Sequence, residues 1–253
     1  GLVVLLAALT ALREVGSPVW NEVNLTAIFN SDEELFSPTS RPLIEAAARR
    51  ADTVCVMEPA RPDGEYTYVR KGAGMFRMEV GGRAAHSGSQ PELGRSAVVE
   101  LAQKIILLDR ISRSELGTTV NVGMIEGGER ANVVAAHAAC RFDLRVLSHE
   151  EAERAQRRFT EIRDLQFIPD TTTTLTGEMM FPPLPARDCN AYLFELVRRA
   201  GRKLGLELRD IVTGSASDGN TAGQFAPTMD GMGVQGDGSH AEREFIHLSS
   251  LNE

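Results

Sequence analysis

The sequence predicts an α/β protein in which a mostly parallel sheet with flanking helices is interrupted by an inserted module of a different kind. Helix-like and strand-like apolar patterns alternate over residues 1–59 and again beyond residue 185, as is typical of a parallel sheet covered by helices. Between them, the predicted elements follow the order β-α-β-β-α-β, which is the order of a ferredoxin-like unit. We therefore expect two domains, residues 1–72 together with 178–253, and an insertion over 73–177.

Before the insertion, we expect a helix over residues 2–15, a strand over 23–30, a helix over 40–51 and a strand over 53–59. The first helix is apolar on nearly every face, so we expect it to be buried, and Gly16 and Pro18 end it. The run 23–30 is rich in residue types that favour strands. Ser40 is the expected N-cap of the second helix, and Pro42 stands in its first turn, where a missing N–H costs little.

Within the insertion, we expect a strand over residues 74–82, a helix over 94–111, strands over 118–128 and 138–147, a helix over 148–162 and a strand over 171–177. The strands alternate apolar and polar positions, as half-exposed strands do. Ser148 and Glu151 have the spacing of a capping box at the start of the second helix. After the insertion, a helix over 191–206, a strand over 208–214 and a short helix from Ser217 continue the α/β pattern.

Composition limits the classes of partner. The chain has 253 residues, 42% of them hydrophobic, and a formal charge of −8, which argues against nucleic acid or an anionic membrane as its main partner. No stretch reaches the roughly 20 apolar residues that span a bilayer. Cys55, Cys140 and Cys189 lack zinc-ribbon spacing and suit a reducing compartment, so we expect a cytoplasmic protein, with a lost export signal as the open alternative.

Acidic residues and a histidine stand at the ends of the predicted strands. Glu33 and Glu34 follow the first strand, Glu58 ends the next, and His240 lies in a glycine-rich loop near the end of the sequence. Because α/β sheets bind ligands at the carboxyl ends of parallel strands, we expect these side chains to gather at one edge. Carboxylates and a neutral imidazole are ligands that Zn²⁺ selects. Taken singly, each has a plainer reading, since an acidic turn is usually a solvated loop.

Seven short motifs occur in order along the chain: FNSDEE, VMEPA, GRAAHSGSQPELGRSAV, ERANVV, FDLRV, SASDGNTAG and GDGSHAEREFI. Together they resemble the M20 family of zinc-dependent amidohydrolases and metallopeptidases. The sequence PELG, and DEE followed by EP, are most similar to the carboxypeptidase G2-like, or glutamate carboxypeptidase, branch. The resemblance implies a zinc-peptidase-like catalytic domain and makes the insertion over 73–177 a dimerisation, or lid, domain.

The resemblance also implies roles for the residues at the sheet edge. Two zinc ions per chain are expected, and Co²⁺ or Mn²⁺ would also suit the site. Glu33 would be the general base that activates water and passes the proton to the leaving amine. Glu34 and His240 would bind one metal, and Glu58 would bind the other.

Residues outside this edge have implied roles as well. His86 would reach across a homodimer formed through the inserted domain and polarise the scissile carbonyl in the partner's site. Asn132 and Arg145 would contact the substrate, and a guanidinium suits a substrate carboxylate. The loop around Thr213 would offer backbone N–H groups to the substrate.

The sequence departs from the family pattern in two places. The family's early His-x-Asp and bridging Asp do not stand in these 253 residues, and Gly1 falls where the following helix begins, so we expect the sequence to be cut at both ends. After the insertion's last strand, Glu178 and two methionines replace a basic residue of the glutamate-releasing relatives. The second departure favours other N-acyl or peptidyl amino acids as substrates.

The leading hypothesis is a zinc-dependent carboxypeptidase that cleaves an amide bond adjacent to a carboxylate-bearing amino acid, with a small N-acyl amino acid or short peptide as substrate. A deacylase of N-acyl amino acids is the alternative within the enzymes. If the natural chain begins at Gly1, a metal-free binding or assembly protein on the same scaffold is the alternative outside them.

Overall fold

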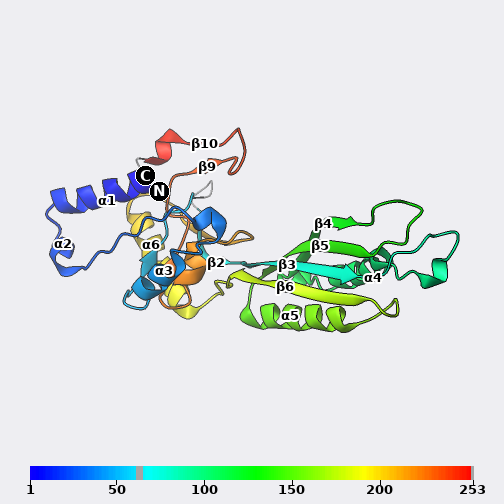
Figure 1. Cartoon of the computed structure of the whole chain (residues 1–253). Coiled ribbons are helices and arrows are strands. Elements are labelled where there is room, and N and C mark those ends of the chain that lie inside the picture. Colours follow the sequence, from blue (N-terminus) through cyan, green and yellow to red (C-terminus); the bar gives the residue numbers. More distant parts are fainter. Residues whose placement is uncertain (61–64, 252–253) are drawn as a thin grey trace. The chain divides into compact units, whose positions relative to one another are not determined.

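Two compact units divide the chain, residues 1–70 with 184–253, and residues 71–183 (Figure 1). The computed structural model describes residues 1–60 and 65–251. The α/β class with an inserted ferredoxin-like module is confirmed. The inserted unit extends beyond the predicted limits of 73 and 177, because its last strand continues to Phe181.

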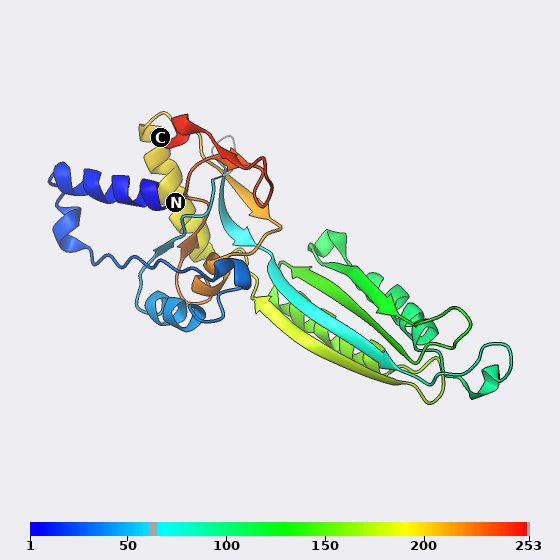
Figure 2. The ribbon, with the colours of Figure 1, turned by 45° about the horizontal axis from the view of Figure 1, so that its top comes forward.

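The inserted unit consists of β3 (Gly72–Gly81), α4 (Ala97–Asp109), β4 (Thr119–Gly127), β5 (His137–Val146), α5 (His149–Asp164) and β6 (Thr172–Phe181). Its four strands form an antiparallel sheet in the order β4-β5-β3-β6 (Figure 2). Short 3-10 turns at Pro91–Leu93 (η3) and Ser114–Leu116 (η4) lie in the connections. This strand order belongs to the ferredoxin-like arrangement that the sequence predicts.

One face of this sheet is packed against both helices. Strand β3 buries alternate residues, among them Phe76, Met78 and Val80, since successive side chains of a strand point to opposite faces. The rings of Phe76 and Phe142 each lie 5.0 Å from that of Phe159 on α5. The aromatic cluster therefore joins the two central strands to a helix.

The N-terminus of α5 shows half of the predicted capping box. The Ser148 hydroxyl accepts a hydrogen bond from the N–H of Glu151 at 3.2 Å. The Glu151 carboxylate does not return to Ser148 but binds Arg154 and Thr118. A partner from another segment thus replaces the local one.

The first unit holds its strands in short pairs. β1 (Val54–Cys55) is parallel to β8 (Thr228–Met229), β2 (Glu65–Arg70) is parallel to β7 (Arg209–Thr213), and β9 (Gly236–Asp237) is antiparallel to β10 (Phe245–Ile246). An antiparallel bridge between Thr67 and Asp230 joins the two parallel pairs. The parallel pairing that the sequence predicts is present, in a sheet that is mixed at this bridge.

The helices of the first unit are α1 (Leu2–Glu14), α2 (Val19–Glu22), α3 (Arg41–Ala48), α6 (Asp188–Lys203) and α7 (Asp218–Ala222), with 3-10 turns η1 (Glu33–Leu35) and η5 (Leu248–Leu251). Helix α3 packs its buried Ile44 and Ala48 against Ala222 of α7. None of the helices among residues 1–60 and 65–251 is long and apolar enough to cross a membrane.

Two predictions for the first unit are wrong. Helix α1 forms and ends at Glu14, two residues before Gly16, which has a φ of +59°. The helix is exposed instead of buried, with Val3 64% and Leu6 53% accessible. Residues 23–30 are extended chain without strand pairing, and Phe29 is 65% exposed. A strand requires a neighbouring strand, and the described residues place none beside this segment.

Candidate active site

The acidic turn predicted at Glu33 and Glu34 is closed by backbone hydrogen bonds. The Asp32 carbonyl accepts hydrogen bonds from the N–H groups of Leu35 and Ser37 at 3.0 and 2.8 Å, and the turn η1 lies between them. Phe36 and Ser37 have positive φ values of 68° and 53°, a conformation that disfavours residues other than glycine. The backbone is therefore held in place by contacts and does not follow from local preference.

The Asp32 carboxylate joins the turn to the start of α3. It accepts hydrogen bonds from the N–H and hydroxyl of Thr39 at 2.8 and 2.7 Å and from the Ser40 hydroxyl at 2.6 Å. These donors hold the pKa of Asp32 well below its usual range. Ser40 occupies the predicted N-cap position of α3, but its hydroxyl does not cap the helix, because it is bound to Asp32.

Glu33 lies among other carboxylates. Burial, followed in order by the charges of Glu58, Asp218, Glu34 and Asp230, raises its pKa to about 7. The pKa of Glu58 is raised for the same reason, burial first and then Asp230, while Arg70 opposes the shift. The first unit thus brings together the acidic residues that the sequence predicts at the ends of separate segments.

His240 approaches Glu34 from the loop after β9. Its Nε2 atom lies 3.7 Å from a carboxylate oxygen of Glu34, and both side chains are about three-quarters exposed. A carboxylate and an imidazole are suitable ligands for zinc. In the described part of the chain, however, no three His, Cys, Asp or Glu side chains are arranged to hold a metal ion.

Thr213 ends β7 and begins a loop that is tied to a buried ion pair. Its hydroxyl lies 3.0 Å from that of Ser215, which accepts a hydrogen bond from Arg70 at 2.9 Å. Arg70 in turn pairs with Asp230 at 2.7 Å, and both side chains are almost fully buried. The predicted substrate loop is therefore hydrogen-bonded, through Ser215, to a buried ion pair.

The inserted unit separates its predicted site residues into two groups. His86 and Asn132 lie together, since the Ser87 N–H donates to the Asn132 carbonyl at 3.1 Å and His86 forms a bridge with Val133. The His86 Nδ1 atom accepts hydrogen bonds from the N–H groups of Gly88 and Ser89 at 3.1 and 3.2 Å, so the loop backbone orients the imidazole ring.

Arg145 lies at the other end of the sheet. It pairs with Ala73 at the start of β3, whereas His137 and Gly81 mark the end that leads to His86. Eight residues of β5 separate the two ends, roughly 27 Å at about 3.4 Å per residue. Because of this distance, His86 and Arg145 of one chain cannot contact the same small molecule. Arg145 is itself paired with Asp143 at 2.9 Å.

The other histidines of the chain are His137, His149 and His247. His137 begins β5 and contacts Glu79 at 2.7 Å on the exposed sheet face. His149 is the first residue of α5, and His247 stacks edge-on against Phe245. Glu178 lies within β6, opposite Met75, and not after the last strand as predicted.

Sequence reasoning missed three charged residues of this site, Arg70, Asp218 and Asp230. Asp218 stands inside the motif SASDGN, for which the sequence predicted a role of the loop backbone only. Asp230 follows β8 as Glu58 follows β1, so the same strand-end argument could have identified it. Arg70 ends β2 and has no distinguishing signal in the sequence.

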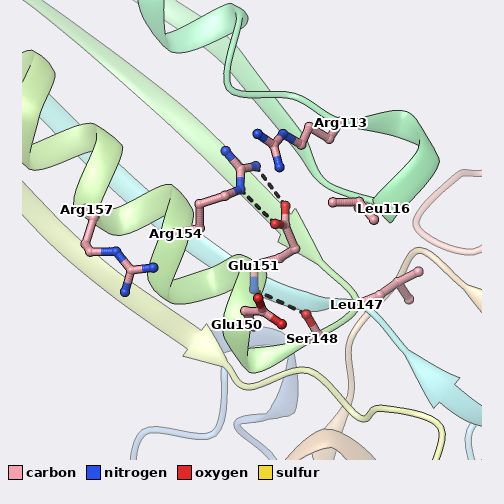
Figure 3. Close-up of a pocket in the computed structure, with 8 residues that line it drawn as sticks. All are labelled: Arg113, Leu116, Leu147, Ser148, Glu150, Glu151, Arg154 and Arg157. Carbon is pink, nitrogen blue, oxygen red and sulfur yellow. Dashed lines mark hydrogen bonds and ion pairs between the residues drawn. The ribbon is translucent and has the colours of Figure 1, made fainter.

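A cavity of about 380 Å³ lies in the inserted unit, and none of the predicted site residues belongs to its lining (Figure 3). Its lining consists of Arg113, Leu116, Leu147, Ser148, Glu150, Glu151, Arg154 and Arg157. Arg154 and Glu151 form two hydrogen bonds of 2.7 Å each, so much of the charge is neutralised within the wall. The arrangement stabilises the start of α5 and brings no catalytic group into the cavity.

Comparison with known proteins agrees with this architecture. Residues 68–171 match the family model of the M20 peptidase dimerisation domain. Carboxypeptidase G2 of a Pseudomonas species is 27% identical over 258 residues, which cover 99% of this chain and 61% of that protein. Acetylornithine deacetylase of Myxococcus xanthus is 31% identical over 152 residues, 55% of this chain and 39% of that protein. The chain thus spans less than two thirds of these relatives.

Solved structures show the same fold. The aminopeptidase PepT of Bacillus cereus matches with a TM-score of 0.74 and 24% identity, over 87% of this chain and 59% of that one. A tripeptidase of Staphylococcus aureus matches with a TM-score of 0.69 and 24% identity, over 80% of this chain and 54% of that one. The inserted unit thus matches the dimerisation domain of M20 peptidases, and the chain as a whole is related to carboxypeptidase G2 and shares the fold of these solved peptidases.

Proposed function

We propose that the protein is a zinc-dependent hydrolase that cleaves an amide bond next to a carboxylate-bearing amino acid. The observation that carries this proposal is the placement of Glu33 beside a carboxylate–imidazole pair, Glu34 and His240, whose atoms lie 3.7 Å apart. Members of the M20 family are generally metal-dependent, and the named relatives are peptidases and a deacetylase.

The acidic residues would have two different roles, metal binding and proton transfer. Glu34 and His240 would hold one zinc ion and Glu58 a second. The metal, when bound, acts as a Lewis acid that makes water nucleophilic near neutral pH. Glu33 would accept a proton from the attacking water and deliver it to the departing amine nitrogen.

The inserted domain would supply the groups that recognise the substrate. His86 and Asn132 lie at one end of this domain and Arg145 at the other, too far apart to act on one molecule from one chain. A homodimer would resolve this separation, because the partner's copy can contribute His86 and Asn132 while the chain contributes its own Arg145. His86 would then polarise the scissile carbonyl, and Arg145 would bind the substrate carboxylate.

The substrate would be an N-acyl amino acid or a short peptide. Carboxypeptidase G2 favours a carboxypeptidase, and the acetylornithine deacetylase favours a deacylase as the second candidate. Glu178 is exposed on β6 and is acidic where glutamate-releasing relatives carry a basic residue, which favours the second candidate. A panel of N-acyl glutamates against neutral N-acyl amino acids separates the two, because only the carboxypeptidase reading predicts a preference for the acidic residue.

Substitution of Glu33 by Gln tests the mechanism. The amide keeps the size of the side chain but accepts no proton, so we expect turnover to fall about 10²–10⁴-fold with the zinc content unchanged. The measurements are kcat on the best substrate and zinc per chain by atomic emission, in the full-length protein.

The matched control is the neighbouring Glu34→Gln, which we expect to lose zinc as well as activity. Loss of zinc from Glu33→Gln with retention in Glu34→Gln would reverse the two roles. A wild-type protein that binds no zinc and cleaves none of the panel would instead support the metal-free binding protein.

A further inference from the structure

The turn that carries Glu33 and Glu34 is fastened at both of its ends to a single residue of another segment. The Ser37 hydroxyl donates a hydrogen bond to one carboxylate oxygen of Asp218, and the Asn30 amide donates to the other at 2.7 Å. Asn30 precedes the turn and Ser37 follows it. We propose that Asp218 is a positioning residue that holds Glu33 and Glu34 in the orientation required by the proposed hydrolase, on whose activity this inference rests.

The turn requires such a fastening. Phe36 and Ser37 both adopt left-handed backbone conformations, which residues other than glycine keep only when their surroundings impose them. The neighbouring carboxylates also repel each other, since Glu33 senses the charges of Glu58 and Glu34. Without an external anchor, strain and repulsion would both move the turn toward solvent.

Asp218 is a long-range anchor, whereas Asp32 is a local one. Asp32 joins the turn to Thr39 and Ser40, which are its close neighbours in sequence. Asp218 is 188 residues away from Asn30 and belongs to α7, which packs beside α3. Asp218 therefore joins the turn directly to a segment that is distant in sequence, which the contacts of Asp32 do not do.

The anchor is itself rigid. Ser217, just before Asp218, is 1% exposed and forms a capping box with Asn220, and its hydroxyl also donates to Asp230. Gly219, just after Asp218, leaves no space for a side chain, because a Cβ atom there would lie 2.5 Å from the Asp230 carboxylate.

Asp230 completes the support through its buried ion pair with Arg70. Arg70 also binds Ser215, so the loop before α7 is held from the same side. The contacts therefore run without interruption from Arg70 through Asp230, Ser217 and Asp218 to the acidic turn. A displacement of about 1 Å in a catalytic group can cost on the order of 10²-fold in rate, which gives this support a functional consequence.

The test compares Asp218→Ala, Ser37→Ala and their double variant in the full-length protein. We expect Asp218→Ala to lower kcat by about 10- to 100-fold while KM changes less than threefold, because the substrate groups lie elsewhere. Ser37→Ala should lower kcat less, and the double variant should be no slower than Asp218→Ala, since both substitutions remove the same contact. Additive losses, or an unchanged kcat in Asp218→Ala, would overturn the proposal.

The control is Asp188→Asn, an exposed acid in the first turn of α6 that removes one charge and should leave kcat unchanged. If Asp218→Ala does not fold, the milder Ser37→Ala decides, with at least a threefold loss of kcat at wild-type thermal stability expected.

Hydrogen exchange separates this inference from the proposed function. The N–H groups of Leu35, Phe36 and Ser37 are bonded within the turn, and they should exchange at least tenfold faster in Asp218→Ala, with α5 unchanged. An inactive wild-type protein would contradict the hydrolase and still allow this measurement. Wild-type exchange rates in Asp218→Ala would contradict the positioning role whether or not the protein is an enzyme.

Discussion

Single residues show how this chain tolerates charge in its interior. Lys104 and Glu100 of α4 form an ion pair of 3.2 Å with no exposure of either side chain. Lys104 also donates to the carbonyls of Ile162 and Arg163 at the end of α5, at 3.0 and 2.9 Å. Burial lowers the pKa of Lys104, and the neighbouring Glu100 opposes that shift. The pair therefore joins the end of α5 to α4 through the Lys104 ammonium group.

Lys104→Met should be strongly destabilising. It leaves the Glu100 carboxylate buried without a countercharge, so we expect a loss of about 3–5 kcal/mol in the free energy of unfolding. Urea denaturation followed by circular dichroism measures this. The double variant Lys104→Met/Glu100→Gln keeps an acceptor for the N–H groups of Phe167 and Ile168 without a charge, and should lose less. An equal loss in both variants would show that the unpaired charge is not the cause.

At the scale of elements, each strand depends on its neighbours. Strand β4 stands at one edge of the inserted sheet and β6 at the other. β4 carries exposed apolar residues, with Met124 63% and Ile125 65% accessible, whereas β6 begins with a run of threonines. An apolar edge strand readily pairs with another chain, so β4 is the edge that the proposed homodimer would use.

Ile125→Lys should therefore shift the protein toward monomers. A charge on an edge strand opposes pairing between chains, and we expect the dimer dissociation constant to rise at least tenfold. Light scattering coupled to size exclusion measures the mass over a range of concentrations. Thr174→Lys, on the opposite edge strand, is the matched control and should leave the mass unchanged. A wild-type monomer, or equal effects of both substitutions, would contradict this interface.

On the scale of the whole molecule, the two units differ in how they are built. Residues 71–183 are continuous in sequence and enclose their own core, to which both helices and all four strands contribute. The other unit is assembled from two separate segments, and its helix α1 exposes apolar residues such as Leu2 and Val3. The insertion is the unit that has the requirements for independent folding.

Residues 71–183 expressed alone should fold cooperatively. The expected result is a single sharp transition in differential scanning calorimetry, with calorimetric and van't Hoff enthalpies in agreement. The same fragment with Phe159→Ala is a useful comparison, because the buried ring contacts both Phe76 and Phe142, and its loss should cost about 3–5 kcal/mol. A broad, non-cooperative transition in the unaltered fragment would contradict independent folding.

The sequence by itself determined the inserted module and the order of its elements, because alternation in strands and the 3.6-residue period of helices are local properties. It also proposed Glu33, Glu34, Glu58 and His240 as a candidate set, although residues 23–30, the predicted strand before Glu33 and Glu34, form no strand. Tertiary structure decided what depends on partners distant in sequence. Residues 23–30 have the composition of a strand but no neighbour to pair with, and α1 has an apolar surface that no described element covers. The support of the acidic turn by Asp218, 188 residues from Asn30, is of the same kind, since no local pattern records which distant carboxylate a hydroxyl and an amide will meet.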